Sequence, residues 1–342
     1  MQQLGAMMTR YTCLAFTPDG RGLVAGTDDG TIHGWRTADG HPYQVAAWQG
    51  VSIASVAFRP DGHILAVGRA NGSVTFWQEA HTYSHHAPIR PEERLDLLVY
   101  SPDGQYLAAG NTAGGVTLWQ VATQRPLNDF NDYYGGVTSV QFTADGQTLV
   151  LATRNGPLWL GEGTSGRLYR TLDELSAQTV GRAQVVACSS DGAWLASGRE
   201  DGVVQVWRLG DGRLHQLGRH DCAVTALTFA PDGRRLVSGS SDGFVRVWEV
   251  VTGRQAHALP TECGVASLQF LPQGEAVRGL GQDGTVWTWT PLSGERRIAA
   301  APSLCWPGLG RGSVVWAAGG TAVAVCGADS RVRWWVAPPS PA

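Results

Sequence analysis

The sequence contains no lysine, because all 26 of its basic residues are arginine. A chain without a lysine amine cannot form a Schiff base with a carbonyl substrate, and it cannot supply the lysine of a phosphate-binding loop. The exclusive use of arginine favours a GC-rich, bacterial genome as the source. The basic residues are interspersed with 29 acidic ones and the net charge is only −3. This balance lacks the electrostatic footprint of a nucleic-acid binder.

Cysteine pairs, long apolar runs and a signal pattern are also missing. The six cysteines are scattered and include no Cys-x-x-Cys pair, which predicts reduced thiols in a cytosolic protein. The uncharged, glycine-interrupted run Ser313–Ala328 is too short to span a bilayer. The N-terminus has no charged-then-apolar signal pattern. We therefore expect a soluble, cytoplasmic protein without membrane contact.

Glycine, in contrast, is abundant, with 45 residues, and its positions reveal an internal repeat. A first turn glycine recurs eight times with spacings of 42, 42, 42, 46, 41, 41 and 46 residues, at Gly20, Gly62, Gly104, Gly146, Gly192, Gly233, Gly274 and Gly320. A second turn glycine follows ten residues later in seven copies, and Ser330 replaces it in the eighth. Five residues further on stands a tryptophan, except in the fourth copy, which has Gly161.

Each copy is predicted to form four short strands, a to d. In the sixth copy, strand a covers Val224–Phe229, strand b covers Arg235–Ser240 and strand c covers Val245–Glu249. The a–b turn contains Pro-Asp-Gly and the b–c turn contains Asp242-Gly243. Asx-Gly pairs between β-branched residues are the strongest short-range hairpin signal, because glycine accepts the positive φ that the turn requires.

In its period, its Pro-Asp-Gly turn and its Gly-x-x-Asp-Gly-x-Val-x-Val-Trp ending, the whole chain resembles the WD-repeat β-propeller family. The resemblance implies an all-β propeller of four-stranded antiparallel blades. The aspartate that follows the tryptophan in the family's signature is absent here. The family's buried hydrogen-bond tetrad is matched in full by one copy, at His220, Ser238, Asp242 and Trp248. We therefore expect most blades to be held by apolar packing.

The chain ends predict how the propeller closes. Twenty-two residues follow Gly320 and twenty lead up to and include Gly20, which together make one further repeat. This arithmetic predicts a closed eight-bladed propeller over residues 1–337, in which the N-terminal segment Gln2–Ala6 supplies the outer strand of the last blade. Such closure removes exposed sheet edges. The proline-rich tail 338–342 ends the fold. The alternative is a seven-bladed ring with one degenerate blade appended.

Motifs that resemble catalytic or metal sites fall on hairpins. The Gly-x-Ser-x-Gly pattern at Gly239–Gly243 lies at a b–c turn rather than at the strand-to-helix turn that a nucleophile requires. The Gly-x-Gly-x-x-Gly pattern at Gly161–Gly166 lies at a c–d turn with no helix behind it. The cluster of His81, His85 and His86 maps to an outer strand. We expect no catalytic residue, cofactor or metal site.

The b–c and d–a connections of an antiparallel meander share one edge, the top rim, where the family often holds protein partners. Arginines and tyrosines in these connections have the composition enriched at interfaces and would suit an acidic or phosphorylated partner segment. The candidate partner-binding residues are Arg10, Arg69, Arg94, Tyr133, Tyr134, Arg154, Arg182, Arg199, Glu200 and Trp306. Interleaved Asp28, Glu92 and Glu200 would alternatively neutralise the arginines. Trp306, in a proline-framed insertion, is either an interface anchor or a cap on the junction of the last two blades.

These features predict a non-catalytic interaction scaffold, a monomeric disc within a hetero-complex, that binds partner proteins through its top rim. One alternative is a subunit or sensor in a bacterial signalling or defence complex with a protease, kinase or nucleotide-hydrolysing partner. Another is an enzyme or small-molecule binder that uses the axial channel, which would require polar and acidic groups at the starts of the a strands. Fold alone does not decide among them.

Overall fold

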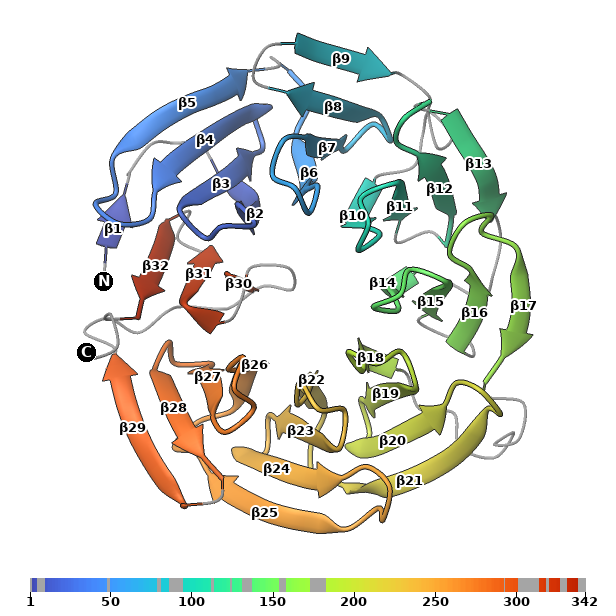
Figure 1. The fold of residues 1–342 in the computed structure, drawn as a ribbon. Coiled ribbons are helices and arrows are strands. Elements are labelled where there is room, and N and C mark those ends of the chain that lie inside the picture. Colours follow the sequence, from blue (N-terminus) through green and yellow to red (C-terminus); the bar gives the residue numbers. More distant parts are fainter. Residues whose placement is uncertain are drawn as a thin grey trace. The chain divides into compact units, whose positions relative to one another are not determined.

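The computed structural model describes residues 2–4, 10–47, 50–78, 81–85, 95–111, 114–123, 125–130, 137–153, 158–172, 183–291, 293–300, 314–317, 320–326 and 331–337. Within these residues the chain forms eight four-stranded antiparallel sheets (Figure 1). We call them blades 1 to 8 in chain order. The predicted four-stranded repeat is confirmed, and in blade 6 the predicted strands agree with the observed ones to within one residue.

The chain divides into two compact units, of which the first comprises Met1–Leu98, Asp283–Thr285 and Ile298–Ala342. In this unit blade 1 consists of β2 (Tyr11–Phe16), β3 (Gly22–Thr27), β4 (Thr31–Arg36) and β5 (Pro42–Ala47). Blade 2 consists of β6 (Ile53–Phe58), β7 (Leu65–Arg69), β8 (Val74–Gln78) and β9 (His81–His85). Blade 8 consists of β30 (Val314–Trp316), β31 (Ala322–Cys326), β32 (Val332–Val336) and β1 (Gln2–Leu4).

The second unit comprises Val99–Gln282 and Val286–Arg297, so the first strand of blade 3 and the last strand of blade 7 are each divided in sequence between the units. Blade 3 consists of β10 (Leu95–Tyr100), β11 (Tyr106–Asn111), β12 (Val116–Gln120) and β13 (Arg125–Phe130). Blade 4 consists of β14 (Val137–Phe142), β15 (Thr148–Thr153), β16 (Leu158–Glu162) and β17 (Leu168–Thr171). Blade 5 consists of β18 (Ala183–Cys188), β19 (Trp194–Arg199), β20 (Val203–Arg208) and β21 (Arg213–Arg219). Blade 6 consists of β22 (Val224–Phe229), β23 (Arg235–Ser240), β24 (Phe244–Glu249) and β25 (Gln255–Pro260), and blade 7 of β26 (Val265–Phe270), β27 (Val277–Gly281), β28 (Val286–Thr290) and β29 (Glu295–Ala300).

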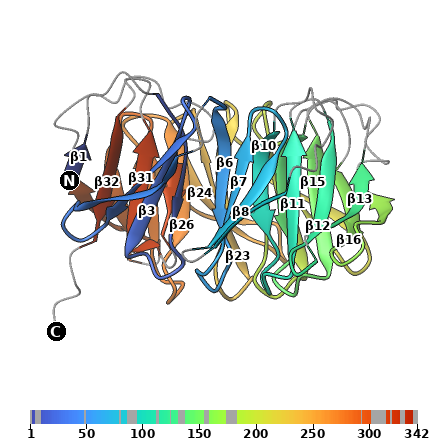
Figure 2. The same cartoon turned by 90° about the horizontal axis from the view of Figure 1, so that it is seen from above.

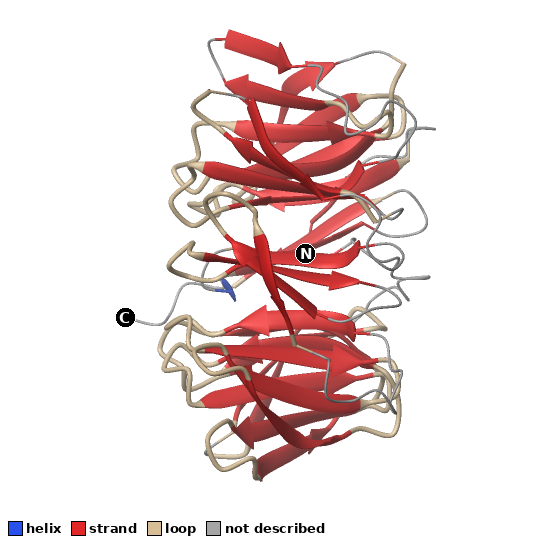
Figure 3. Ribbon diagram, turned by 90° about the vertical axis from the view of Figure 1, so that its right-hand side faces the viewer, coloured by secondary structure: helices blue, strands red, loops and turns tan. Residues whose placement is uncertain are grey.

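Short polar turns join the strands at both ends (Figure 3), and the a–b turn of blade 1 shows how the sequence forms them. The Thr17 hydroxyl donates to Asp19 Oδ1 at 2.5 Å, and the Arg21 amide donates to the same oxygen at 3.0 Å. The hydrogen bond from Thr17 is the main reason why the pKa of Asp19 lies below its ordinary value. Gly20 takes the positive φ of 70° that closes the turn.

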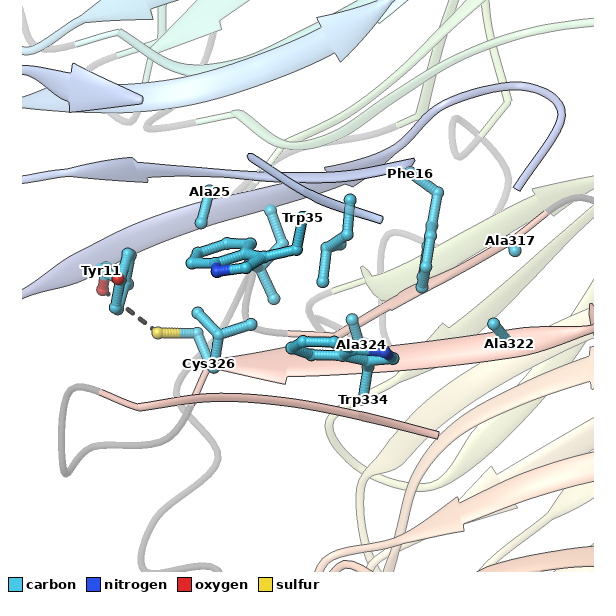
Figure 4. Packing of buried hydrophobic residues seen from close by; sticks show 12 residues of the cluster. Tyr11, Phe16, Ala25, Trp35, Ala317, Ala322, Ala324, Cys326 and Trp334 are labelled. Carbon is cyan, nitrogen blue, oxygen red and sulfur yellow. Dashed lines mark hydrogen bonds between the residues drawn. The ribbon is translucent and has the colours of Figure 1, made fainter. Parts of the chain in front are cut away.

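In the first unit, strands from both chain ends share one sheet. β1 pairs antiparallel with β32, with Gln2 opposite Trp334 and Leu4 opposite Val332 (Figure 2). The outer strand of blade 8 therefore comes from the N-terminal segment. Blades 8 and 1 pack through an apolar cluster in which Trp35 and Trp334 have ring centroids 6.2 Å apart (Figure 4).

In the second unit, small strand-b residues let neighbouring blades approach closely. A Cβ at Gly239 would lie 2.5 Å from Cγ1 of Val265 in the next blade. Threonines in the innermost strands reinforce the packing. The Thr225 hydroxyl lies 3.2 Å from the Gly239 carbonyl of its own blade and 2.5 Å from the Val265 carbonyl of the next. Apolar packing and these backbone contacts hold adjacent blades together.

Candidate partner-binding rim

Two neighbouring sequence positions at the top rim differ in exposure in several blades. The residue eight positions before the strand-c tryptophan ends strand b, and it is buried in blades 1, 2, 3, 5 and 6, as Thr27, Arg69, Asn111, Arg199 and Ser240. We call this position the buried slot. The next residue, seven positions before the tryptophan, is exposed in blades 1, 5, 6 and 7, as Asp28, Glu200, Ser241 and Gln282. We call it the exposed slot.

The buried slot stabilises the b–c turn by different chemistry in each blade. Thr27 donates from its hydroxyl to Asp29 Oδ1 at 2.6 Å and to the Thr31 carbonyl at 2.7 Å. Asn111 accepts the amides of Gly114 and Gly115, each at 2.8 Å. In both cases a buried side chain holds polar groups of the turn that would otherwise lose hydrogen bonds.

Two arginines predicted to contact a partner occupy this buried slot. Arg199 is 5% exposed, and it donates from Nε and Nη2 to the two carboxylate oxygens of Asp201, at 3.2 and 3.0 Å. Arg69 is 7% exposed, and its Nη2 donates to Thr75 Oγ1 at 3.1 Å. Burial lowers the pKa of Arg69. Both side chains are thus buried at the ends of their b strands, and their role in partner binding stays a prediction.

Two other predicted rim residues are exposed. Glu200 lies in the exposed slot beside the Arg199–Asp201 pair. Arg10 is exposed at the start of blade 1, where its backbone amide donates to Asp28 Oδ1 at 3.0 Å. The other predicted rim residues lie outside the described residues: Arg94, Tyr133, Tyr134, Arg154, Arg182 and Trp306. Their role in binding stays a prediction.

The described d–a connections add exposed carboxylates that sequence reasoning missed. Asp221 lies between blades 5 and 6, Glu262 lies 41 residues later between blades 6 and 7, and both are exposed to solvent. With Glu200 they place three exposed carboxylates on the described rim of blades 5 and 6, near the exposed Arg219. The repeat alignment could have identified these two residues, because both stand three positions before the first residue of a strand a.

The predicted tetrad of blade 6 is confirmed. Trp248 Nε1 donates to Ser238 Oγ at 2.8 Å, Ser238 Oγ lies 2.7 Å from His220 Nε2, and His220 Nδ1 lies 3.0 Å from Asp242 Oδ2. His220 and Ser238 are completely buried. If His220 is neutral and carries its proton on Nδ1, each donor in this series of hydrogen bonds has one acceptor. The tetrad is therefore a structural link between strands b and c and the d–a connection.

The titration behaviour of the tetrad agrees with this arrangement. Burial lowers the pKa of His220, although the neighbouring Asp242 opposes the shift. Burial by itself would raise the pKa of Asp242, but hydrogen bonds from the Asp221 amide and from His220 bring it below its ordinary value. The pair is thus a neutral imidazole beside a carboxylate at neutral pH.

The catalytic-looking motifs lie where the hairpins were predicted. Ser240 is buried at the β23–β24 turn, where its hydroxyl donates to the Cys222 carbonyl at 3.1 Å and accepts from the Asp242 amide. Gly161–Gly166 covers the end of β16 and the turn that leads to β17. Within the described residues no group of three His, Cys, Asp or Glu side chains is placed to hold a metal ion, and no helix is long and apolar enough to cross a membrane.

Comparisons with known proteins agree with this architecture. The family model of the WD domain, G-beta repeat (WD40), matches residues 9–36, 40–78, 173–208 and 212–249. Among solved structures, the chain is similar to the computationally designed Ika8 protein, with a TM-score of 0.76 and 23% identity over 98% of each chain. At this identity the similarity shows the fold alone. The eight four-stranded blades are therefore those of a β-propeller, and the chain belongs to the WD40-repeat β-propeller family.

Proposed function

We propose that the chain is a non-catalytic scaffold that binds a partner protein through its top rim. Propellers of this family are generally protein-interaction scaffolds. The observation that carries the proposal is the contrast between the two slots. The buried slot is used for internal hydrogen bonds in each described blade that has one, whereas the exposed slot presents a different side chain in each blade. Exposed positions that vary on a fixed frame are those available for recognition.

The finer proposal concerns the connections around blade 4, where we place the contact with an acidic or phosphorylated segment. Arg154 stands seven positions before Gly161, which replaces the tryptophan, and so aligns with the exposed slot. Arg182 directly precedes strand a of blade 5, and Tyr133 and Tyr134 precede strand a of blade 4. Guanidinium groups pair bidentately with carboxylate or phosphate, and tyrosine adds rigid contact area.

The test is affinity purification of the tagged chain from its native host, with the wild type beside an Arg154→Glu/Arg182→Glu variant. Charge reversal at a contact between an arginine and an acidic segment replaces attraction by repulsion, so we expect recovery of the partner to fall about tenfold or more. Arg199 is left unchanged, because its pairing with Asp201 would confuse loss of binding with loss of stability.

The matched control is Arg234→Glu/Arg254→Glu, which makes the same charge change at two exposed arginines in the a–b and c–d turns of blade 6. These turns lie at the edge of the blade opposite its top rim, so the control should recover the partner as the wild type does. Equal recovery by the rim variant and the wild type would exclude the acidic segment. Equal losses in both variants would indicate a general effect of charge.

A further inference from the structure

The second unit contains a cavity of about 540 Å³ beside the outer strand of blade 4. It is lined by Trp159 of β16, by residues 168–172 of and just after β17, and by Gly212 of the turn between β20 and β21. β17 has four residues, whereas the corresponding outer strand of blade 5 has seven. The volume lies within the range of small-molecule sites. The cavity shares no residue with the proposed rim contact.

The Arg170 side chain is fixed at this cavity by the neighbouring blade. Its Nη2 donates to the Asp211 carbonyl at 2.8 Å. The guanidinium lies against Gly212, because a Cβ built on that glycine would be 1.8 Å from Nη2. Gly212 has a positive φ of 70°, so the turn itself favours the residue that leaves this space open.

No carboxylate among the described residues is paired with Arg170. Within the described part of the chain its one hydrogen bond goes to a neutral carbonyl, and none of the residues that line the cavity is acidic. The Asp211 carboxylate instead accepts the Arg213 amide at 2.9 Å. A guanidinium has five N–H donors, so four remain for a ligand. A partly buried cation with unused donors favours an anion with two acceptor oxygens.

Apolar surface lies next to this cation. The buried Leu172 lines the cavity from the same face of the sheet as Arg170, and Tyr169 is 53% exposed at its edge. A phenol offers a face and an edge for aromatic packing. The ligand that satisfies both halves of the cavity is therefore a carboxylate joined by a short linker to an aromatic ring.

We propose that this cavity is a binding site for an aryl-alkyl carboxylate, either a free small molecule or the C-terminal phenylalanine or tyrosine of a peptide. The carboxylate accepts two N–H groups of Arg170, and the ring packs against Tyr169 and Leu172. The site is distinct from the proposed rim contact, so failure of either proposal leaves the other standing.

The test is a titration with 3-phenylpropionate, followed by ligand-observed NMR and calorimetry, in parallel with 3-phenylpropanamide and 3-phenylpropylamine. These three probes share the ring and the linker and differ in charge. We expect the acid to bind about tenfold or more tightly than the neutral amide, and the amine to bind more weakly than either, because only the acid forms charge-assisted hydrogen bonds with Arg170. Equal binding of acid and amide would overturn the proposal.

Variants of the cavity give a second readout. Arg170→Gln should lower the affinity for the acid to that for the amide, whereas Arg254→Gln, at an exposed arginine in blade 6, should leave it unchanged. Tyr169→Ala changes a mostly exposed side chain and should weaken binding about threefold to tenfold through lost aromatic packing. This variant keeps the test valid if Arg170→Gln does not fold. Wild-type affinity in either cavity variant would contradict the assignment.

Two further probes distinguish the sources of the carboxylate. Acetyl-Gly-Phe with a free C-terminus and its C-terminal amide are titrated in the same way. If the peptide acid binds more tightly than both its amide and 3-phenylpropionate, the site is assigned to a peptide C-terminus. If 3-phenylpropionate binds as tightly as the peptide acid or more tightly, it is assigned to a free small molecule.

Discussion

At the scale of single residues, His220 makes the stability of the fold depend on pH. Burial places its folded-state pKa below its ordinary value of 6.5, so the unfolded chain binds the proton more readily. The contribution of His220 is therefore complete above pH 6.5 and is lost as the pH falls from there toward the folded-state pKa. We expect the unfolding free energy to fall by up to about 1.4 kcal/mol per pH unit in that window. Urea unfolding between pH 5 and 8 measures it.

The variant His220→Gln should flatten this dependence, since glutamine does not titrate. The chain already has Gln49 at the corresponding position of another repeat, so the substitution is compatible with the architecture. His63→Gln is the control, because His63 is exposed in the a–b turn of blade 2. A slope in His220→Gln as steep as that of the wild type would show that other groups cause the dependence.

The tryptophans of blades 3 and 6 allow the hydrogen bond of the tetrad to be measured apart from packing. Trp119 and Trp248 are both buried, at 1% and 3% exposure. The indole N–H of Trp248 donates to Ser238, whereas that of Trp119 has no hydrogen-bond partner among the described residues. We expect Trp248→Phe to cost about 1 kcal/mol more unfolding free energy than Trp119→Phe, because only the former leaves a buried polar partner behind. Equal changes in urea unfolding of the two variants would contradict this.

At the scale of elements, the b–c turn of blade 5 depends on Gly202. Its φ is +89°, and a Cβ there would lie 2.2 Å from the His220 carbonyl oxygen. The Gly202 carbonyl also accepts the His220 amide at 2.9 Å, so the turn cannot move away without losing this bond. We expect Gly202→Ala to lower the unfolding free energy by about 3 kcal/mol or more, from the left-handed conformation together with the clash.

Gly294→Ala provides the comparison for that prediction. Gly294 has a φ of +70°, and nothing lies within 4 Å of the position of its added Cβ. It therefore isolates the conformational cost, about 1 kcal/mol. Thermal and urea unfolding of both variants give the difference. Similar losses in the two would show that the contact with His220 is not rigid.

The same turns show how far sequence reasoning extends at this scale. Strand and turn positions were predicted in blade 6 because Asx-Gly pairs determine where the chain reverses. The exposure of the rim arginines was not predicted, because adjacent residues at the rim differ in exposure. Arg199 in the buried slot and Glu200 in the exposed slot are adjacent in sequence. Composition alone cannot separate them, whereas counting back from Trp207 does.

At the scale of the whole chain, the repeat period predicted eight blades because the first turn glycine recurs eight times, and most copies keep the second turn glycine and the tryptophan in the same register. The cavity beside β17 could not be predicted in this way. It depends on how Arg170 of one blade meets Gly212 of the next. Gly212 is a turn glycine that recurs in other copies, for example as Gly166 and Gly253, whereas Arg170 lies at a position that the repeat leaves variable. A single sequence shows which positions vary between copies, but it does not show which of their side chains meet in space.

The two chain ends offer the last test, because residues 2–4 pair with β32 from the other end of the sequence. Deleting residues 1–6 removes this strand and leaves the backbone groups of β32 unpaired at a sheet edge. We expect the thermal midpoint to fall by at least about 2–4 °C, the shift that 1 kcal/mol produces in a large domain, and aggregation on heating to increase. Deleting residues 338–342, which contribute to none of the described strands, is the control and should leave both unchanged. A midpoint unaffected by the first deletion would mean that the β1–β32 pairing adds no stability, and that blade 8 is held by the packing of Trp334 against Trp35.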